Sequence, residues 1–378
     1  MSSYHSAIEL PAPNPEQIAH SSRLIDRIIQ HIETAGGVIS FRDYMQHCLY
    51  EPGLGYYAAG AAKFGAAGDF VTAPEVSALF GHTLANSLSN LFNQGVAPHV
   101  LEFGAGTGKM CIDIIQRLNA QGVDWQAYSI LETSSDLQQR QQALLEQQLS
   151  AADLQKVSWL CGLPQVFNGV VLGNEVLDAM PVHILLKDKE WLELGVAYRD
   201  QKFVWQPLAN DSAAVQQIVR IDAGQPLPDQ YCTELNLNYQ PWCKSLAACC
   251  HQAVLLLIDY GYLQSQYYHP HRNTGTLVCF YQHRVHPDPL IYPGLQDITA
   301  FVDFDAFADA ALEAGFTISS LSTQAEFLIA NGLLELVPAT TDTMQQMAFS
   351  QQVKSLTLPG EMGEKFKVIE LRKGFDPG

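Results

Sequence analysis

The sequence predicts an α/β protein, built on a doubly wound sheet with a helical N-terminal region and β-rich or loop-like insertions. First, short apolar runs alternate with stretches of helical periodicity from His99 onward, as they do in strand–helix–strand units. Second, a glycine-rich turn from Gly104 to Gly108 separates the first of these runs from the helical stretch that follows. Third, 47% of the residues are hydrophobic, which is enough for a sizeable core.

Residues 1–98 are expected to form a helical region ahead of the sheet. Isoleucine and leucine recur at helical spacing over residues 16–36, a stretch that ends at two glycines. Ser40 follows as a candidate N-cap for a short helix over residues 41–49. The region therefore begins with two predicted helices.

A long loop is predicted between Glu51 and Pro74, where glycine and aromatic residues are interspersed. It is longer than a simple connection needs to be, which indicates a function of its own. At its end, Thr72 and Glu75 have the spacing of a capping box, with a proline between them at an early helical position. A third helix is therefore expected to begin at Thr72.

The core domain is expected to span residues 99–378, as a parallel sheet with helices between its strands. Its predicted strands lie at residues 99–103, 126–131, 157–160, 169–173, 254–258, 316–321 and 366–371. Its predicted helices lie at residues 109–120, 134–149 and 304–314. Strand-like runs without intervening helices occur at residues 182–186, 191–198 and 202–205. We therefore place insertions in this domain at about residues 182–235 and 262–302.

Charge and cysteine usage narrow the possible partners and the compartment. Asp and Glu number 39 against 21 Lys and Arg, which gives a formal net charge of −18. An acidic surface disfavours nonspecific binding to nucleic acid or anionic membranes, and it suits a basic protein partner. The chain has no signal-peptide pattern and no apolar stretch near the roughly 20 residues that span a bilayer. Its eight cysteines are scattered without a C-x-x-C pair, so we expect reduced thiols, no metal site and a cytoplasmic location.

The glycine turn is the first candidate for ligand binding. Gly104, Gly106 and Gly108 allow a sharp turn and let the backbone approach a ligand closely. Glu102 precedes them, and an acidic strand end followed by G-x-G-x-G favours S-adenosylmethionine. This cofactor has no phosphates, so it does not require a complete phosphate cradle at the helix N-terminus. A tight turn without a ligand is the structural alternative.

Two other nucleotide-binding motifs fit the turn less well. A P-loop would need glycine at position 103 and serine or threonine at position 110, where the sequence has Phe103 and Met110. A dinucleotide fingerprint would need its third glycine at position 109, where the sequence has Lys109. The P-loop is therefore excluded, and a nicotinamide cofactor is disfavoured.

Glu132 is expected at the end of the second strand of the sheet. A carboxylate at this position can accept hydrogen bonds from both ribose hydroxyls of an adenosine. Nicotinamide enzymes share this role, so Glu132 supports an adenosine ligand without choosing between the cofactors. The alternative is a solvated glutamate at the start of the helix that follows.

The segment from Asn174 to Asp178 follows a very hydrophobic run, which is expected to be a central strand. Ligands in open α/β sheets bind beyond the carboxyl ends of such strands. Asp178 lies three residues after Glu175, so a single helical turn would place both carboxylates on one side. Paired carboxylates can hold a guanidinium and accept its proton as it is alkylated. The alternative is Asp178 as a helix cap and Glu175 as a surface residue.

Asp259 ends another hydrophobic run, and it is expected either to face the same site or to cap the turn that follows. Histidines and arginines gather further along the chain, at His269, His271, Arg272, His283, Arg284 and His286. Since they show no metal-ligand spacing, a substrate-binding loop is the preferred interpretation.

Together, these motifs resemble the MidA-type family of methyltransferases, which includes the mitochondrial complex I assembly arginine methyltransferase. The resemblance covers roughly residues 39–371. Besides the glycine turn, it rests on the segments YEPGLGYY (50–57), GDFVTAPE (68–75), NE (174–175), DAMPV (178–182), DYG (259–261), PGLQDIT (293–299), VDF (302–304) and GEMGEKFKV (360–368).

The resemblance implies a class I methyltransferase fold, S-adenosylmethionine as cofactor, and methylation of an arginine in a protein partner. That partner would belong to a respiratory complex or another assembly. We expect the cofactor to be bound by Glu102, Gly104, Gly106, Gly108, Glu132 and Asn174. Glu175 and Asp178 are expected to orient the acceptor.

The resemblance also gives the long loop a purpose. Residues 53–75 are expected to close over the cofactor, with Thr72 and Glu75 near its methionine end. Two alternatives stay open beside a catalytic methyltransferase. One is a noncatalytic assembly or chaperone factor that retains the fold as a binding module, and the other is an NAD-dependent oxidoreductase.

Overall fold

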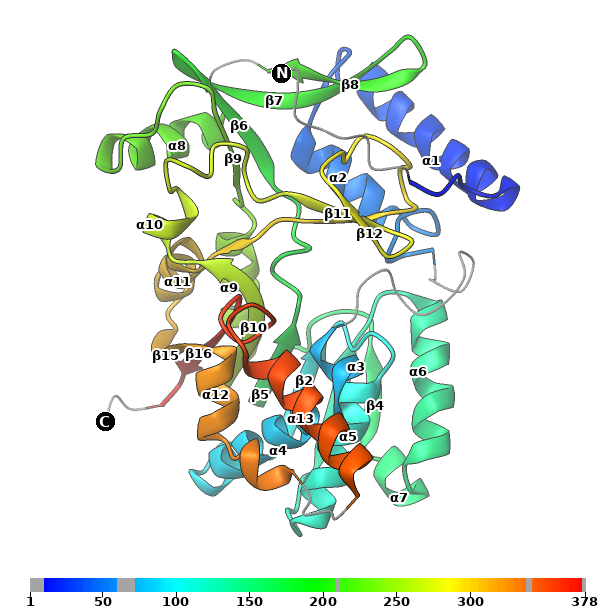
Figure 1. The fold of residues 1–378 in the computed structure, drawn as a ribbon, viewed down its shortest axis with the longest axis vertical. Helices are drawn as coiled ribbons and strands as arrows, with labels where there is room; N and C mark the ends of the chain where they lie inside the picture. Colours follow the sequence, from blue (N-terminus) through cyan, green and yellow to red (C-terminus); the bar gives the residue numbers. More distant parts are fainter. Residues whose placement is uncertain (1–9, 60–71, 209–210, 338–341, 376–378) are drawn as a thin grey trace. The chain divides into compact units, whose positions relative to one another are not determined.

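The computed structural model describes residues 10–59, 72–208, 211–337 and 342–375, and the chain divides into two compact units (Figure 1). The first unit consists of Met1–Phe70, Ala179–Asn238 and Gln264–Phe301. The second consists of Val71–Asp178, Tyr239–Leu263 and Val302–Gly378.

The second unit is built on an eight-stranded sheet in the order β15-β16-β10-β5-β2-β3-β4, with β14 paired to β10. The strands from β10 to β4 run parallel to one another, whereas β16 is antiparallel to both β10 and β15. The strands are β2 (His99–Phe103), β3 (Ala127–Leu131), β4 (Val157–Leu160), β5 (Phe167–Asn174), β10 (Cys250–Tyr262), β14 (Val302–Asp303), β15 (Thr317–Thr323) and β16 (Phe366–Lys373). The predicted α/β doubly wound sheet is thereby confirmed.

Hydrophobicity on both faces explains why β5 and β10 lie at the centre of this sheet. Val170, Val171 and Leu172 of β5 are buried, as are Leu255 and Leu256 of β10. Strands that read as continuous apolar runs are typical of parallel sheets covered by helices on both faces. Hydrophobic burial therefore fixes the strands whose carboxyl ends carry the candidate residues.

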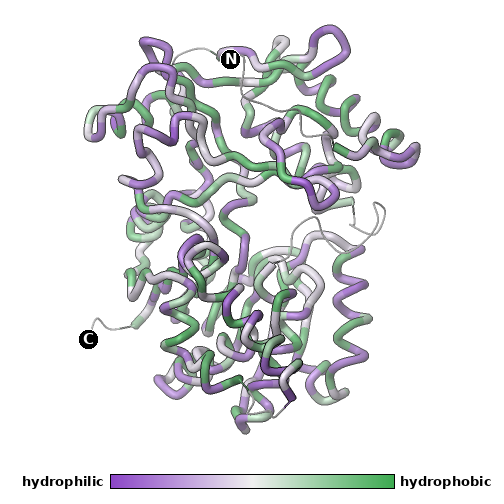
Figure 2. Tube along the Cα trace, in the orientation of Figure 1, coloured by the Kyte–Doolittle hydropathy of each residue, from purple (hydrophilic) through white to green (hydrophobic). Residues whose placement is uncertain are grey.

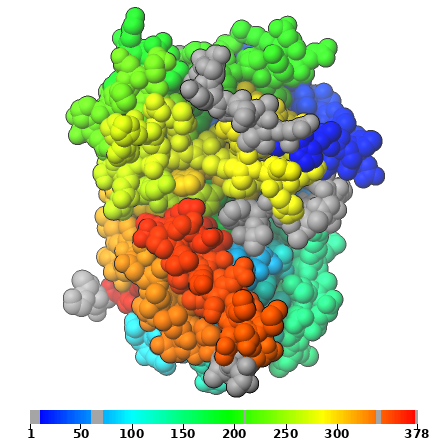
Figure 3. Space-filling model, in the orientation of Figure 1, coloured from blue at the N-terminus to red at the C-terminus, as the bar shows by residue number. Residues whose placement is uncertain are grey.

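Helices connect these strands, and several pack in pairs. They are α3 (Ala73–Val76), α4 (Ala78–Asn93), α5 (Lys109–Ala120), α6 (Ser135–Gln148), α7 (Ala151–Leu154), α9 (Tyr239–Cys249), α11 (Phe304–Glu313), α12 (Gln324–Ala330) and α13 (Thr343–Thr357), with a 3₁₀ turn η2 at Leu334–Leu336. Helix α4 packs along α5, and α9 packs along α11. Helix α13 lies on the face of this unit shown in Figure 3, and its Met344 and Met347 are exposed.

The first unit combines two small antiparallel sheets with helices from three stretches of the chain. In its five-stranded sheet the order is β1-β7-β6-β9 with β8 paired to β7, and the three-stranded sheet has the order β12-β11-β13. The strands are β1 (Ile39–Ser40), β6 (His183–Asp188), β7 (Glu190–Arg199), β8 (Lys202–Pro207), β9 (Tyr231–Leu235), β11 (Val278–Tyr281), β12 (Arg284–His286) and β13 (Asp297–Thr299). The helices are α1 (Pro15–Thr34), α2 (Phe41–Tyr50), α8 (Ala213–Gly224) and α10 (Gln264–Tyr267).

One hydrophobic cluster unites the separate segments of the first unit. Leu24 and Ile28 of α1 and Phe41 of α2 are fully buried in it. Val196 of β7 and Ile298 of β13 belong to the same cluster. Residues from all three segments therefore share one core.

The division into units differs from the predicted boundary at residue 98. Helix α4, which the sequence grouped with the N-terminal region, belongs to the second unit. The insertions expected at about residues 182–235 and 262–302 fall within the later segments of the first unit. The chain leaves and re-enters the second unit, so no single cut in the sequence separates the two.

Helix capping agrees with the sequence in one case and differs in another. Ser40 caps α2, since its hydroxyl accepts from the backbone N–H of Asp43. The capping box predicted for Thr72 and Glu75 is wrong: Thr72 is at the N-cap position of α3, but its side chain makes no capping hydrogen bond. The Glu75 carboxylate instead accepts from the Thr107 hydroxyl at 2.6 Å, a partner that the local pattern does not reveal.

None of the helices in the described parts of the chain is both long and apolar enough to cross a membrane. The same residues contain no group of three or more His, Cys, Asp or Glu side chains arranged to hold a metal ion.

A substitution at Gly261 tests the packing of β10 against β14. A Cβ at this position would lie 2.1 Å from the carbonyl oxygen of Val302, the residue with which Gly261 pairs. We expect Gly261→Ala to lower the free energy of unfolding by about 2–4 kcal/mol, because backbone cannot yield as a side chain can. Gly162→Ala, where a Cβ meets nothing within 4 Å, is the control. Equal urea midpoints for the two variants would contradict this packing.

The buried N-cap Asp303 predicts a pH dependence of stability. Its Oδ1 accepts from the Ala306 N–H at 3.1 Å, and burial, followed by the nearby acidic residues, raises its pKa from 3.8 to about 7. A carboxyl group with a raised folded-state pKa favours the folded state at low pH, and that contribution is lost as pH rises through the folded-state pKa.

We expect Asp303→Asn, which keeps a good N-cap, to remove this loss. Between pH 5.5 and 8, the variant should gain about 2 kcal/mol in unfolding free energy relative to the parent. Urea unfolding of both proteins at the two pH values measures the difference, and the constant effect of the substitution cancels. Parallel pH profiles would show that Asp303 does not titrate in this range.

Candidate functional site

The predicted site residues of the second unit lie around the point where the strand order reverses. Strand β2 is followed along the chain by β3 on one side, whereas β5 pairs with its other edge. In open α/β sheets, ligands bind beyond the carboxyl ends of strands at such a switch point. The glycine turn follows β2, Glu132 follows β3, and Asn174 ends β5.

All three glycines of the turn need a left-handed backbone, and two of them face open space. The φ angles of Gly104, Gly106 and Gly108 are +60°, +55° and +89°. Among the described residues, a Cβ on Gly104 or Gly106 would meet nothing within 4 Å, so a ligand can approach the backbone there. A Cβ on Gly108 would lie 2.9 Å from Cδ1 of Leu145, so this glycine is required for packing against α6.

Glu102 is a fully buried carboxyl group at the end of β2. The Tyr128 hydroxyl donates to its Oε2 at 2.6 Å, and its Oε1 has no hydrogen-bond partner in the part of the chain that the structure describes. Burial raises the pKa of Glu102 from 4.5 to about 7, the Tyr128 hydrogen bond opposes this, and the charge of Glu132 adds to it. A buried carboxyl group of this kind can exchange a proton or accept from a bound ligand near neutral pH.

Glu132 is buried beside the turn, which excludes the solvated alternative considered for it. Its Oε1 accepts from the Ser134 N–H at 2.9 Å and its Oε2 from the Gln141 amide at 3.3 Å. Burial raises its pKa, and the hydrogen bonds from Ser134, Gln141 and Thr133 oppose that rise. The carboxylate is therefore fixed in orientation close to the glycine turn.

Gln141 is a site residue that the sequence interpretation missed. Its amide also donates to the carbonyl oxygen of Gly106 at 2.9 Å, which joins α6 to the glycine turn. A signal was present, since Leu137, Gln141 and Leu145 recur every four residues and the polar member occupies an apolar position.

The strand β5 ends in two polar residues with an unusual backbone. Asn174 donates from Nδ2 to Glu175 Oε1 at 3.1 Å, and its buried Oδ1 has no partner among the residues described. Glu175 has a φ of +55°, a conformation that is uncommon for residues other than glycine. Its N–H donates to the carbonyl oxygen of Ile258 at 2.9 Å, which joins Glu175 to β10. Strain of this kind clusters at functional sites.

The helical turn predicted between Glu175 and Asp178 is wrong, because Asp259 organises this segment differently. Its Oδ2 accepts from the N–H groups of Val176, Leu177 and Asp178 at 3.0, 2.8 and 3.3 Å. The residues form an irregular turn around this carboxyl group instead of a helix. Of the two roles considered for Asp259, the structure shows that it faces the same segment as Glu175 and Asp178: its carboxyl group caps the turn that follows β5, not the turn that follows its own strand.

Three carboxyl groups gather at this turn. Asp178 is buried, and the Tyr260 hydroxyl donates to its Oδ2 at 2.5 Å. Burial raises the pKa of Asp259 well above its usual range, and the charges of Asp178 and Glu175 raise it further, while the backbone hydrogen bonds oppose the rise. Like charges held this close favour either a shared proton or a bound cation.

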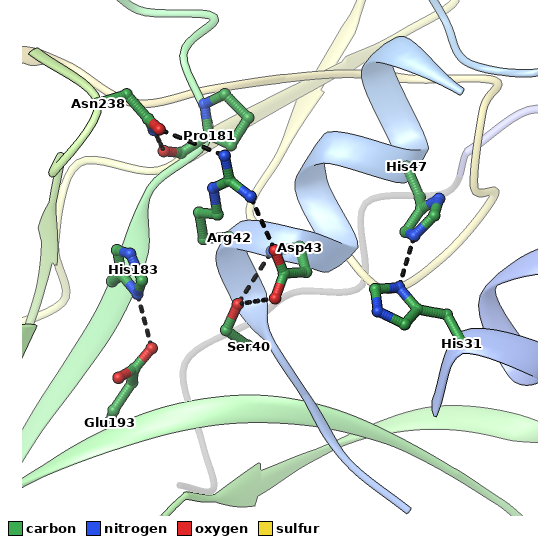
Figure 4. A network of polar contacts seen from close by, with 9 residues as sticks. All are labelled: His31, Ser40, Arg42, Asp43, His47, Pro181, His183, Glu193 and Asn238. Carbon is green, nitrogen blue, oxygen red and sulfur yellow. Dashed lines mark hydrogen bonds and ion pairs between the residues drawn. The ribbon is translucent and has the colours of Figure 1, made fainter. Parts of the chain in front are cut away.

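A separate polar network surrounds α2 in the first unit (Figure 4). The Ser40 hydroxyl and the Arg42 guanidinium donate to the carboxylate of Asp43 at 2.7 and 2.8 Å. Arg42 also donates to Asn238, whose amide donates to the carbonyl oxygen of Pro181. Burial alone would raise the pKa of Asp43, but Ser40 and Arg42 outweigh it and the pKa is lowered.

The same view shows two histidine contacts that join neighbouring elements (Figure 4). His183 of β6 contacts the buried carboxylate of Glu193 on β7 at 2.7 Å. His31 of α1 contacts His47 of α2 at 2.7 Å. These contacts hold the first unit together. The predicted cofactor and acceptor residues lie in the second unit, whereas the histidines and arginines between His269 and His286, expected to form a substrate-binding loop, belong to the first.

The geometry of the second unit fits an adenosine cofactor without phosphates. Gly104 and Gly106 leave open space above the turn, and Glu132 offers a fixed carboxylate beside it. Gly108 is the N-cap of α5, and a Cβ at this position would meet Leu145 of α6, so α6 packs against this end of the turn. These are the features expected for S-adenosylmethionine.

Comparison with known proteins gives the same answer. A family model described as "Putative S-adenosyl-L-methionine-dependent methyltransferase" matches residues 79–322. Among curated relatives, the Drosophila melanogaster protein named "Protein arginine methyltransferase NDUFAF7 homolog, mitochondrial" is 29% identical over 89% of this chain and 82% of its own. The mouse protein of the corresponding name is 28% identical over 89% of this chain and 81% of its own.

Among solved structures, one from Burkholderia thailandensis is described as a "likely methyl transferase" bound to S-adenosyl-homocysteine. It is 40% identical, covers 98% of this chain and 97% of its own, and superimposes with a TM-score of 0.91. A native structure from the same organism is 38% identical with a TM-score of 0.90. These findings remove the nicotinamide alternative and identify S-adenosylmethionine as the cofactor. The chain belongs to this family of S-adenosylmethionine-dependent methyltransferases.

Proposed function

We propose that the protein methylates the guanidinium group of an arginine in a protein partner. The observation that carries this proposal is the group of three carboxyls, Glu175, Asp178 and Asp259, around the turn that follows β5. Their mutual repulsion is relieved when a cation binds among them, and a guanidinium suits paired carboxylates through fork-like hydrogen bonds.

Within this group the three carboxyls have different parts. The carboxyl group of Asp259 accepts from the backbone of the turn, and that of Asp178 accepts from the Tyr260 hydroxyl, so both carboxyl groups support the turn itself. Glu175 is half-buried and stands on a strained backbone, which makes it the best placed to meet an acceptor. We therefore assign Glu175 to contact with the guanidinium and Asp178 to the support of that contact.

The chemistry divides between cofactor and protein. When bound, S-adenosylmethionine supplies an electrophilic methyl group. The carboxylate of Glu175 orients the acceptor nitrogen and accepts the proton that this nitrogen loses on alkylation. Asn174, whose Oδ1 is buried without a partner in the described residues, can accept from an N–H group of cofactor or substrate.

The names of the relatives support an arginine in a protein as the acceptor, since both curated relatives compared above are called protein arginine methyltransferases. The acidic balance of the chain, a formal net charge of −18, also suits a basic segment of a partner. An assembly partner, including a subunit of a respiratory complex, fits both observations. A cytoplasmic location stays a prediction from cysteine usage.

Contact between α3 and the glycine turn supports a cover over the cofactor. The Thr107 hydroxyl donates to Glu75 at 2.6 Å, so α3 lies against the turn that holds the cofactor. This contact supports the part of the proposed cover, residues 53–75, that puts Thr72 and Glu75 near the methionine end of the cofactor. Residues 60–71 of that segment lie outside the described residues, and their part in the cover stays a proposal.

Replacement of Glu175 tests the proposed function. We expect Glu175→Gln to lower the rate of methyl transfer by about a hundredfold or more, because the amide cannot accept the proton or balance the cation. Affinity for S-adenosylhomocysteine should stay within about twofold of the parent, since the oxygen of the introduced amide can still accept the hydrogen bond from Asn174. The assay follows tritiated methyl groups from S-adenosylmethionine into proteins of a lysate from cells that lack this protein, and amino-acid analysis identifies the labelled residue.

Glu146→Gln, an exposed carboxyl on α6, is the matched control and should transfer methyl groups at the parent rate. Label on lysine or histidine instead of arginine would overturn the assigned acceptor. Tight binding of S-adenosylhomocysteine with no label above background would favour the noncatalytic assembly factor.

A further inference from the structure

Helix α6 is mostly hydrophilic, yet it buries a glutamine. Figure 2 shows the polar character along most of its length, and only Gln141 and Leu145 are buried among its residues. Gln141 is 0% exposed. Burial of an amide without partners destabilises the folded state, so a fully buried glutamine on a polar helix requires specific hydrogen bonds.

The amide of Gln141 finds those partners on three different segments. Its Nε2 donates to the carbonyl oxygen of Gly106 at 2.9 Å and to Oε2 of Glu132 at 3.3 Å. Its Oε1 accepts from the indole N–H of Trp159 on β4 at 2.9 Å. The Trp159 contact fixes which end of the amide is the donor, so both donor hydrogens point toward Gly106 and Glu132.

Packing reinforces this arrangement. A Cβ on Gly108 would lie 3.5 Å from Cγ of Gln141 and 2.9 Å from Cδ1 of Leu145, so the turn rests directly on α6. The Gln138 amide donates to the carbonyl oxygen of Glu132 at 2.6 Å, which ties the backbone at the end of β3 to the same helix. One helix therefore holds both the glycine turn and the carboxylate beside it.

We propose that Gln141 is a positioning residue for the cofactor, which sets the distance and orientation between the glycine turn and the ribose-binding carboxylate of Glu132. The proposal rests on the ribose role assigned to Glu132, and it is independent of the identity of the acceptor. Gln141 reaches the cofactor through Gly106 and Glu132.

If Gln141 positions Glu132, its removal changes the pH dependence of cofactor binding, which a loss of packing alone would not do. The Gln141 amide favours the ionised form of Glu132, whose pKa burial raises, and the Ser134 and Thr133 N–H groups act in the same direction. Removing the amide raises the pKa of Glu132 further. Since the ionised carboxylate accepts from the ribose hydroxyls, cofactor affinity is lost as pH falls, and without the amide this loss begins at a higher pH. Glu102, the other carboxyl that interacts electrostatically with Glu132, is present in parent and variant alike.

The test is calorimetric titration of S-adenosylhomocysteine into Gln141→Met, an isosteric variant without the amide, between pH 6 and 9. We expect the dissociation constant at pH 8 to rise about five- to tenfold, and the pH midpoint of binding to move upward. Gln142→Met, the exposed neighbour on the same helix, should leave both quantities unchanged. An unchanged affinity, or a loss that is equal at every pH, would overturn the positioning role.

Two further variants keep the outcome decisive. Trp159→Phe removes the indole N–H that donates to Oε1 of Gln141 and leaves α6 unchanged. We expect a smaller loss of cofactor affinity, with the same upward shift in the pH midpoint of binding. It serves as the deciding variant if Gln141→Met does not fold. Glu132→Gln should weaken binding and remove the contribution of Glu132 to its pH dependence, and unimpaired binding in this variant would overturn both the ribose role and the inference that rests on it. Methyl acceptors are absent from all these titrations, so failure of the arginine proposal would show only in the transfer assay.

Discussion

The carboxyl group of Asp259 inside the turn after β5 is the constraint on which the proposed acceptor side of the site depends. Three successive backbone N–H groups converge on its Oδ2, and a fourth donor, the N–H of Tyr260, binds its Oδ1. These contacts replace the helix that the spacing of Glu175 and Asp178 would otherwise allow. The irregular turn leaves Glu175 in a left-handed conformation at the end of the central strand, and it brings Asp178 within reach of Tyr260.

The two halves of the site rest on different physical principles. On the cofactor side, glycine backbone provides access, and a neutral amide from α6 orients a buried carboxylate. On the proposed acceptor side, three carboxyls share one turn and favour a shared proton or a cation among them. The strand order, with its reversal between β2 and β5, places both halves at the carboxyl ends of adjacent strands.

The local sequence pattern predicted the strands and the glycine turn well, because hydrophobic runs indicate strands buried on both faces and glycines indicate a left-handed backbone. It failed where a partner distant in sequence decides the conformation. Asp259 lies more than eighty residues after the turn that it organises, and the Thr107 hydroxyl takes up the Glu75 carboxylate that would have completed a capping box. The role of Gln141 was missed because its hydrogen-bond partners lie on three segments that only the fold brings together. The predicted boundary at residue 98 differs from the compact units for the same reason: the first unit is assembled from three separate stretches.

Parallel measurement of methyl transfer and cofactor affinity in Asp259→Asn tests most directly whether this carboxyl group shapes the acceptor side. The substitution turns one of two acceptor oxygens into a donor that faces backbone N–H groups. We expect methyl transfer to fall at least about tenfold, while the dissociation constant for S-adenosylhomocysteine stays within about threefold of the parent. Transfer at the parent rate, or loss of transfer and cofactor binding in the same proportion, would contradict the role given to Asp259.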